Sequence, residues 1–176
     1  APGAVSHDVL CAIPAGSHRG ETGDELVRRG VGDGELIVDV APGYILQAGL
    51  PYARARMAIV TDANPVDVPP RYRAPERARR LVSVVADPVD RDGIAIVPAK
   101  EWEVQDLARD AGCRVAVFAT DDDVTIRDTK VACATALVRD RRIVIEHRDA
   151  LADAGPVCDG VALVAQVAGA LAAFAL

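Results

Sequence analysis

Two aspartates occupy positions from which a side chain could bind a metal or move a proton. Asp39 lies at the end of the apolar run 35–40, and Asp62 follows the apolar run 57–61. Open parallel sheets bind ligands at the carboxyl ends of their strands, and a carboxylate there can hold Mg²⁺ directly or through water. Each aspartate could equally cap the turn that follows it. If the two strands are neighbours, we expect both carboxylates to face one crevice.

Other patterns that carry chemistry are missing or indicate ordinary structure. No G-x-x-x-x-G-K-[ST] occurs, so the loop that would cradle nucleotide phosphates is missing. The glycines at 30, 32 and 34 precede a strand instead of opening a helix, which favours a turn. The aspartate run 121–123 resembles a cation site only superficially, because consecutive residues of an extended segment point to alternate sides, and a solvated loop is the favoured interpretation. The histidines are far apart and no serine stands in G-x-S-x-G, so a hydrolase triad has no support.

A group of basic side chains lies on one predicted helix, over residues 76–85. Arg77, Arg79 and Arg80 occupy the face opposite its apolar residues. Such a group can bind an anion, and it is also what the polar face of an amphipathic helix looks like. The polar face is the favoured interpretation.

Composition excludes several classes of partner. The chain has 176 residues, and 20 basic against 26 acidic side chains give a net charge of −6, with aromatic residues at only 3%. Phosphate backbones and anionic lipid would be repelled, so we expect neither nucleic acid nor a membrane as a partner. The run 161–176 is too short to cross a bilayer and predicts a buried helix. Four scattered cysteines indicate buried, reduced thiols, and no signal-like segment is evident in residues 1–5, so the sequence predicts a cytoplasmic protein.

The order of apolar runs predicts the architecture. Strands alternate with helices, and the continuous apolar runs 35–40 and 57–61 are typical of central parallel strands. An irregular loop is expected over 62–75, which contains four prolines. The sequence predicts an α/β fold, with a mostly parallel sheet, helices on both faces and a small antiparallel hairpin near the C-terminal third, in one domain spanning 1–176. The expected strands are 7–13, 35–40, 57–61, 93–97, 113–119, 131–138 and 141–146, and the expected helices are 24–29, 76–85, 101–111 and 161–176.

In blocks, the sequence resembles the central, ATP-binding domain of the Mur ligase superfamily, most closely that of cyanophycin synthetase. Residues 37–50, I-V-D-V-A-P-G-Y-I-L-Q-A-G-L, resemble the family's strand, acidic residue and A-R-G-G-I-L-R segment. Residues 52–62, Y-A-R-A-R-M-A-I-V-T-D, resemble Y-D-R-x-D-V-A-V-V-T-N, and 167–176 resemble the alanine-rich helix that ends the domain. The resemblance covers most of the chain and implies an α/β fold of this kind.

The resemblance also implies a set of site residues, in which several chemical groups are changed. Asp39 stands for the metal-binding Glu, Thr61-Asp62 for T-N, and Pro98-Ala99-Lys100-Glu101 for the nucleotide-contacting N-A-D-D. The D-H segment is matched by residues 64–67 without its His, and the modified Lys falls near Arg79 or Arg80, which cannot form a carbamate. The binding residues implied are Asp39, Gly43, Thr61, Asp62, Asn64 and Lys100, with Asp39 as the metal ligand. Mg²⁺ and ATP are implied as cofactors only if the ancestral site survives.

The sequence therefore favours a degenerate Mur-ligase-like domain without ATP-dependent ligase activity of its own. Such a pseudoenzyme would act as a binding or assembly subunit, with a second copy of itself or a complete ligase as partner. A second hypothesis is a small-molecule enzyme whose crevice has been reassigned and uses Asp39 and Asp62, with Lys100 beside them. A third is that the chain is a fragment whose phosphate loop lies upstream.

Overall fold

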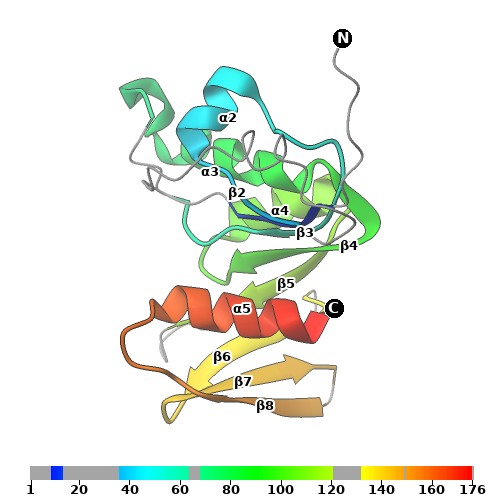
Figure 1. Cartoon of the computed structure of the whole chain (residues 1–176), viewed down its shortest axis with the longest axis vertical. Helices are drawn as coiled ribbons and strands as arrows, with labels where there is room; N and C mark the ends of the chain where they lie inside the picture. The colour runs from blue at the N-terminus through cyan, green and yellow to red at the C-terminus, as the bar shows by residue number, and fades with distance from the viewer. Residues whose placement is uncertain (1–8, 14–35, 64–67, 121–131, 149, 176) are drawn as a thin grey trace.

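The computed structural model describes residues 9–13, 36–63, 68–120, 132–148 and 150–175, which form an α/β fold around one mixed sheet (Figure 1). The sheet has eight strands in the order β2-β1-β3-β4-β5-β6-β7-β8. The strands are β1 (Val9–Ile13), β2 (Leu36–Asp39), β3 (Ala55–Ile59), β4 (Val89–Pro98), β5 (Arg114–Phe118), β6 (Thr135–Arg139), β7 (Arg142–His147) and β8 (Ala150–Pro156). The helices are α2 (Pro42–Ala48), α3 (Pro75–Ser83), α4 (Trp102–Asp110) and α5 (Leu163–Ala175), with short 3-10 turns η1 (Pro70–Tyr72) and η2 (Val84–Ala86).

The first six strands in sheet order are parallel, and the last two add antiparallel pairs. Each pair from β2 to β6 is parallel, whereas β6–β7 and β7–β8 are antiparallel. The β6–β7 hairpin turns at Asp140 and Arg141, whose φ angles are 49° and 58°. Positive φ at both central residues is typical of the tight turns whose twist matches that of the strands. The predicted hairpin is therefore confirmed, with its turn one residue later than expected.

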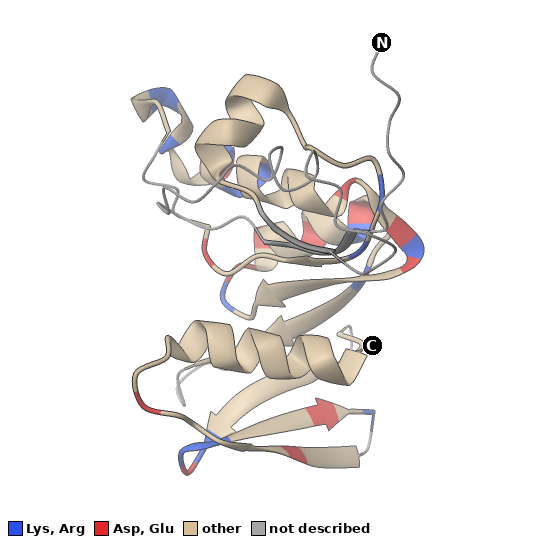
Figure 2. Cartoon of the chain, viewed as in Figure 1, with Lys and Arg blue, Asp and Glu red and all other residues tan. Residues whose placement is uncertain are grey.

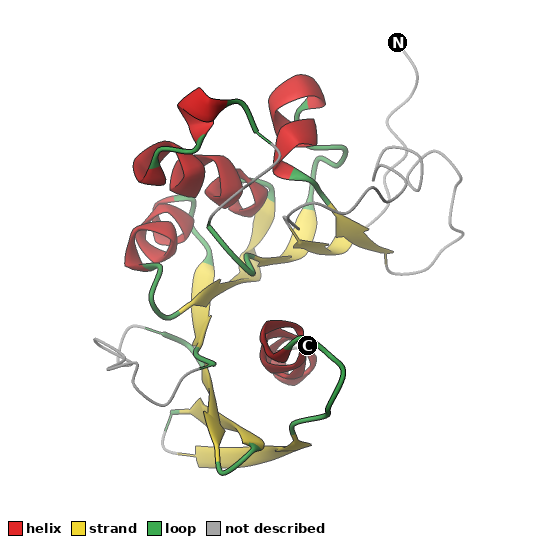
Figure 3. Cartoon of the chain, turned by 90° about the vertical axis from the view of Figure 1, so that its left-hand side faces the viewer, coloured by secondary structure: helices red, strands yellow, loops and turns green. Residues whose placement is uncertain are grey.

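Helices cover both faces of the sheet, as predicted, but they do so unequally. Helices α2, α3 and α4 lie on one face, and the sheet curves around α5 on the other (Figure 3). The core under α2–α4 includes Ala95, Val97, Val115 and Val117, while Ile94, Ile96, Ala116 and Phe118 face the core that contains α5. Successive side chains of a strand point to opposite faces, so β4 and β5 must be apolar at every position to be buried on both.

Several sequence predictions need correction. Strand β2 is not central but lies at the edge of the sheet, next to β1. The proline-rich loop contains the 3-10 turn η1, and two elements, α2 and β8, were not expected as a helix and a strand. The predicted helix 24–29 lies outside the described residues. Helix α5 buries only Val167, Ala168 and Leu171, and Phe174 is 42% exposed, so it is a half-buried and not a buried helix.

Candidate functional site

Several of the predicted binding residues lie along one edge of the sheet. Because β1 to β5 are all parallel, their carboxyl ends meet at the same edge, where such sheets bind ligands. Asp39 ends β2, Thr61 and Asp62 follow β3, and Lys100 follows β4. This carboxyl edge is the candidate site, and its geometry differs from one strand to the next.

The two aspartates stand on strands that are not neighbours. Strand β1 lies between β2 and β3, so two strand spacings, about 10 Å, separate the backbones that carry Asp39 and Asp62. The condition under which both carboxylates would face one crevice is therefore not met. The Asp62 side chain is exposed, and the side chain of Asp39 is not among those described.

A small hollow brings together Thr61 and Lys100. Its volume is about 40 Å³, close to that of one or two water molecules, and Thr120, two residues after the end of β5, also lines it. Thr61 and Lys100 are thus placed together as candidate binding residues. Thr120 was missed, although its place directly after a predicted strand was a usable signal. The hollow is lined by Thr61, Pro98, Ala99, Lys100, Phe118, Ala119, Thr120 and Val164.

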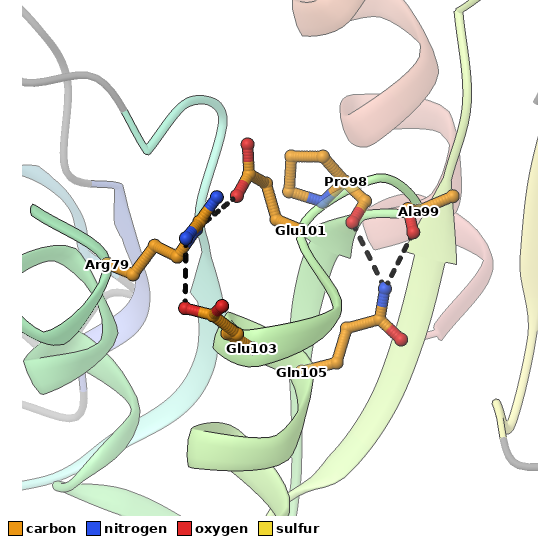
Figure 4. A network of polar contacts seen from close by, with 6 residues as sticks. All are labelled: Arg79, Pro98, Ala99, Glu101, Glu103 and Gln105. Carbon is orange, nitrogen blue, oxygen red and sulfur yellow. Dashed lines mark hydrogen bonds and ion pairs between the residues drawn. The ribbon is translucent and has the colours of Figure 1, made fainter. Parts of the chain in front are cut away.

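A buried glutamine, Gln105, holds the backbone of the turn that carries Lys100. Gln105 Nε2 donates hydrogen bonds to the carbonyl oxygens of Pro98, at 3.2 Å, and Ala99, at 3.0 Å (Figure 4). Gln105 is only 8% exposed, and the Ala99 amide donates to the Phe118 carbonyl oxygen at 2.7 Å. Buried backbone groups without partners are costly, so these bonds fix the turn between β4 and α4. Lys100, on this fixed turn, is exposed.

The guanidinium group of Arg79, on α3, forms ion pairs with two glutamates at the start of α4. Arg79 Nε donates to Glu101 Oε2 at 3.1 Å and its NH1 donates to Glu103 Oε2 at 2.9 Å (Figure 4). The hydrogen bond to Glu101, outweighing the opposing effect of burial, raises the pKa of Arg79 above its ordinary value, with Glu103 adding to it. Sequence reasoning missed this contact. The two carboxylates after β4 are thereby engaged in ion pairs that join α3 to α4.

The remaining predicted residues are spread over other elements. Gly43 lies in the first turn of α2, a helix of seven residues that begins with Pro42 and has no side-chain cap. Asn64 lies outside the described residues. Gly43 is not among the described residues that line the hollow with Thr61 and Lys100.

The described donors do not form a cage for a divalent cation. Nowhere in the part of the chain that the structure describes do three His, Cys, Asp or Glu side chains come together in a metal-binding group. Mg²⁺ is usually held by one or two carboxylates together with water and phosphate oxygens. Glu101, the most buried of the edge's described carboxylates, already faces Arg79. Asp39 as a metal ligand stays a prediction.

The cysteines differ in exposure. Cys113 is buried, its Sγ lies 3.4 Å from the Ala86 carbonyl oxygen, and burial, with the Asp87 carboxylate adding to it, raises the pKa of the thiol. Cys133 is half-buried and Cys158 is exposed, and all three are free thiols. The predicted burial is confirmed for Cys113 and wrong for Cys158, which lies in the exposed segment before α5, and the side chain of Cys11 is not among those described.

These features define a class: an α/β domain with a mainly parallel sheet and polar groups collected at its carboxyl edge. Among solved structures, it is similar to UDP-N-acetylmuramoylalanyl-D-glutamyl-2,6-diaminopimelate--D-alanyl-D-alanyl ligase from Acinetobacter baumannii, with a TM-score of 0.51 and 11% sequence identity. The match covers 95% of this chain and 37% of the ligase chain. The chain therefore shares its fold with part of that ligase and spans little more than a third of the ligase's length.

Sequence comparisons add nothing to the structural match. No protein-family profile matches the chain, and no curated protein matches it either. Across the described residues, no helix is both long enough and apolar enough to span a membrane.

Proposed function

We propose that this chain is a degenerate Mur-ligase-like domain, nearest to that of cyanophycin synthetase, which binds ligands or partners and does not catalyse ATP-dependent ligation alone. The observation that carries the proposal is the pairing of Arg79 with Glu101 and Glu103. Glu101 follows β4 at the last position of the segment that the resemblance matches to the nucleotide-contacting N-A-D-D, and Glu103 lies two residues further on. Here they stabilise the packing of α3 on α4 and are not free to bind a nucleotide or its metal.

The sequence supports the same conclusion from the phosphate side. A ligase that forms an acyl phosphate must hold the ATP phosphates and Mg²⁺ in line with a carboxylate. The chain has no G-x-x-x-x-G-K-[ST], so the backbone donors and the lysine of a phosphate loop are missing. Positioning and charge stabilisation are nearly all of the catalysis in phosphoryl transfer, and without them no ligation is expected.

The hollow of Thr61, Lys100 and Thr120 is the part of the edge that suits ligand binding. The ammonium group of Lys100 and the hydroxyl groups of Thr61 and Thr120 can bind one carboxylate or one phosphate group at this hollow of about 40 Å³. As a subunit, the domain would present this edge to a second copy or to a complete ligase. A small-molecule enzyme that uses Asp39 and Asp62 gains no support, because β1 separates their strands.

Isothermal titration with Mg·ATP and with Mg·ADP tests the proposal, together with an assay for phosphate release. We expect the wild type to release no phosphate from ATP above background. We also expect any nucleotide binding to be the same in the wild type and in Asp39→Ala. The variants are Asp39→Ala and, as a matched control, Asp92→Ala, which removes an exposed carboxylate in the amino-terminal part of β4. Nucleotide turnover or tight binding that Asp39→Ala abolishes and Asp92→Ala preserves would contradict the proposal.

A further inference from the structure

The segment that contains η1 and α3 is strongly basic, although the protein as a whole is acidic. Residues 68–83 contain five arginines and a single acidic residue, Glu76, whereas the whole chain has a net charge of −6. Figure 2 shows basic positions on η1 and along α3, above the sheet. The five arginines are Arg71, Arg73, Arg77, Arg79 and Arg80.

These arginines separate into two groups by what they contact. Arg79 pairs with Glu101 and Glu103, and Arg73 Nε donates to the Val68 carbonyl oxygen at 3.1 Å. Arg71, Arg77 and Arg80 instead line an open hollow of about 440 Å³, with Tyr72 and Leu81 as its other walls. We call it the arginine hollow. No acidic side chain is among its lining residues in the described structure.

Local contacts hold two of the three guanidinium groups in place. Arg77 NH1 donates to the Arg71 carbonyl oxygen at 3.1 Å, which ties α3 to η1. The guanidinium carbon of Arg71 lies 5.0 Å from the centre of the Tyr72 ring, a cation–π contact. The η1 turn is closed by the Tyr72 amide, which donates to the Pro69 carbonyl oxygen at 2.8 Å. Groups ordered before binding lose less entropy when a ligand arrives.

Other exposed arginines of the chain show what the arginine hollow lacks. Arg54 pairs with Asp90, Arg139 with Glu146 and Arg142 with Asp153. Three guanidinium groups around one hollow, with no carboxylate among its walls, repel one another until an anion neutralises them. Guanidinium forks match carboxylate and phosphate oxygens in two-point hydrogen bonds.

We propose that the arginine hollow binds a small oligoanion that carries at least two carboxylate or phosphate groups. The ligand is small because the charge of −6 on the whole chain repels an extended polyanion such as a nucleic acid. The arginine hollow shares no lining residue with the hollow of Thr61, Lys100 and Thr120. Its ligand is therefore recognised independently of the function proposed for the carboxyl edge.

Calorimetric titration of the whole chain at low salt, with inorganic pyrophosphate and separately with tricarballylate, tests this proposal. We expect the double variant Arg77→Gln/Arg80→Gln to weaken binding by at least about tenfold, since two charge-assisted contacts are lost. Arg91→Gln/Arg148→Gln is the matched control, because it removes the same net charge from exposed residues outside the arginine hollow. We expect this control to bind nearly as the wild type does.

The two probes distinguish the source of the charge. Binding of pyrophosphate alone assigns a phosphorylated ligand, and binding of tricarballylate alone assigns a polycarboxylate. Binding of both supports the general oligoanion site. The proposal is overturned if neither probe binds at millimolar concentration, or if the control variant loses as much affinity as the double variant. Thermal melting of each variant verifies that it remains folded.

Discussion

The parallel part of the sheet, β1 to β5, and the antiparallel part, β6 to β8, differ in how they are covered. Strands β3, β4 and β5 lie between α2–α4 on one face and the α5 core on the other. Strands β6 and β7 contribute Ala136, Ile143 and Ile145 only to the α5 core, and cross-strand ion pairs lie on their exposed side chains. Polar groups that could bind ligands collect at the parallel end, whereas the antiparallel end supports α5.

The largest expected effect comes from opening the core in the parallel part. Ile96 in β4 is fully buried, and Ile96→Ala should lower the free energy of unfolding by about 3 kcal/mol through lost burial and a new cavity. Leu151 in β8 is 66% exposed, and Leu151→Ala should change it by less than about 0.5 kcal/mol. Urea unfolding followed by circular dichroism measures both. Equal losses would contradict the expectation that the burial of Ile96, and the exposure of Leu151, decide what each contributes to stability.

Gly93 tests close packing at the start of the buried stretch of β4. A Cβ atom at this position would lie 2.5 Å from the Arg56 carbonyl oxygen and 2.9 Å from that of Asp90. Gly93→Ala should therefore destabilise the protein by about 2 kcal/mol, because the neighbouring backbone must move. The same unfolding experiment measures it, with Gly169→Ala as control, since nothing lies within 4 Å of the Cβ position there. A Gly93→Ala protein as stable as the control variant would refute the close contact.

At Arg141, in the antiparallel part, we expect a substitution to stabilise the protein. Its φ of 58° is left-handed, which costs a side-chain-bearing residue about 1 kcal/mol relative to glycine. Arg141→Gly should therefore raise the melting temperature, although it removes the exposed ion pair with Asp159. Arg141→Ala removes the same ion pair and keeps the strain, so it should not be stabilising. If both variants melt alike, backbone strain is not what the glycine relieves.

The smallest effect is a dependence of stability on pH at the edge of the antiparallel part. The hydrogen bond from Arg142, and then that from the Gly155 amide, lower the pKa of Asp153 below its ordinary value of 3.8. Its contribution to stability is therefore complete above pH 3.8 and is lost as the pH falls through the lowered value. Asp153→Asn should cost a little stability at pH 6, and the difference from wild type should vanish in acid. Asp87, in the parallel part, has its pKa raised by burial, so Asp87→Asn should not cost stability at pH 6.

The parallel strands could be predicted because burial on both faces leaves a continuous apolar run. The runs 57–61, 93–97 and 113–119 correspond to β3, β4 and β5 for this reason. Such a run says nothing of how many neighbours a strand has, and β2 was wrongly placed at the centre. Strand β8 was missed because its sequence A-L-A-D-A-G-P is mostly exposed and contains neither β-branched nor aromatic residues.

The candidate site was predictable only as far as strand ends can be read. Asp39 and Asp62 were identified because each stands at a strand end, whereas Thr61 and Lys100 came from the resemblance, and the structure places these two at one hollow. The pairing of Arg79 with Glu101 spans 22 positions in the chain and depends on how α3 packs against α4. Likewise, whether Asp39 and Asp62 meet depends on the order of strands in the sheet, which no local pattern contains.

The sequence order of the strands also sets how costly each pairing is to begin. Strands β6, β7 and β8 are consecutive and joined by short turns, whereas Val9 of β1 pairs with Leu36 of β2, 27 positions later in the chain. Closing a longer loop costs more entropy, and local hairpins form within microseconds. We therefore expect refolding to begin at the C-terminal meander, with amides of β6 and β7 protected first in pulse-labelled hydrogen exchange. Earlier protection of the β1 amides would contradict this expectation, because it would show that folding begins in the parallel part of the sheet.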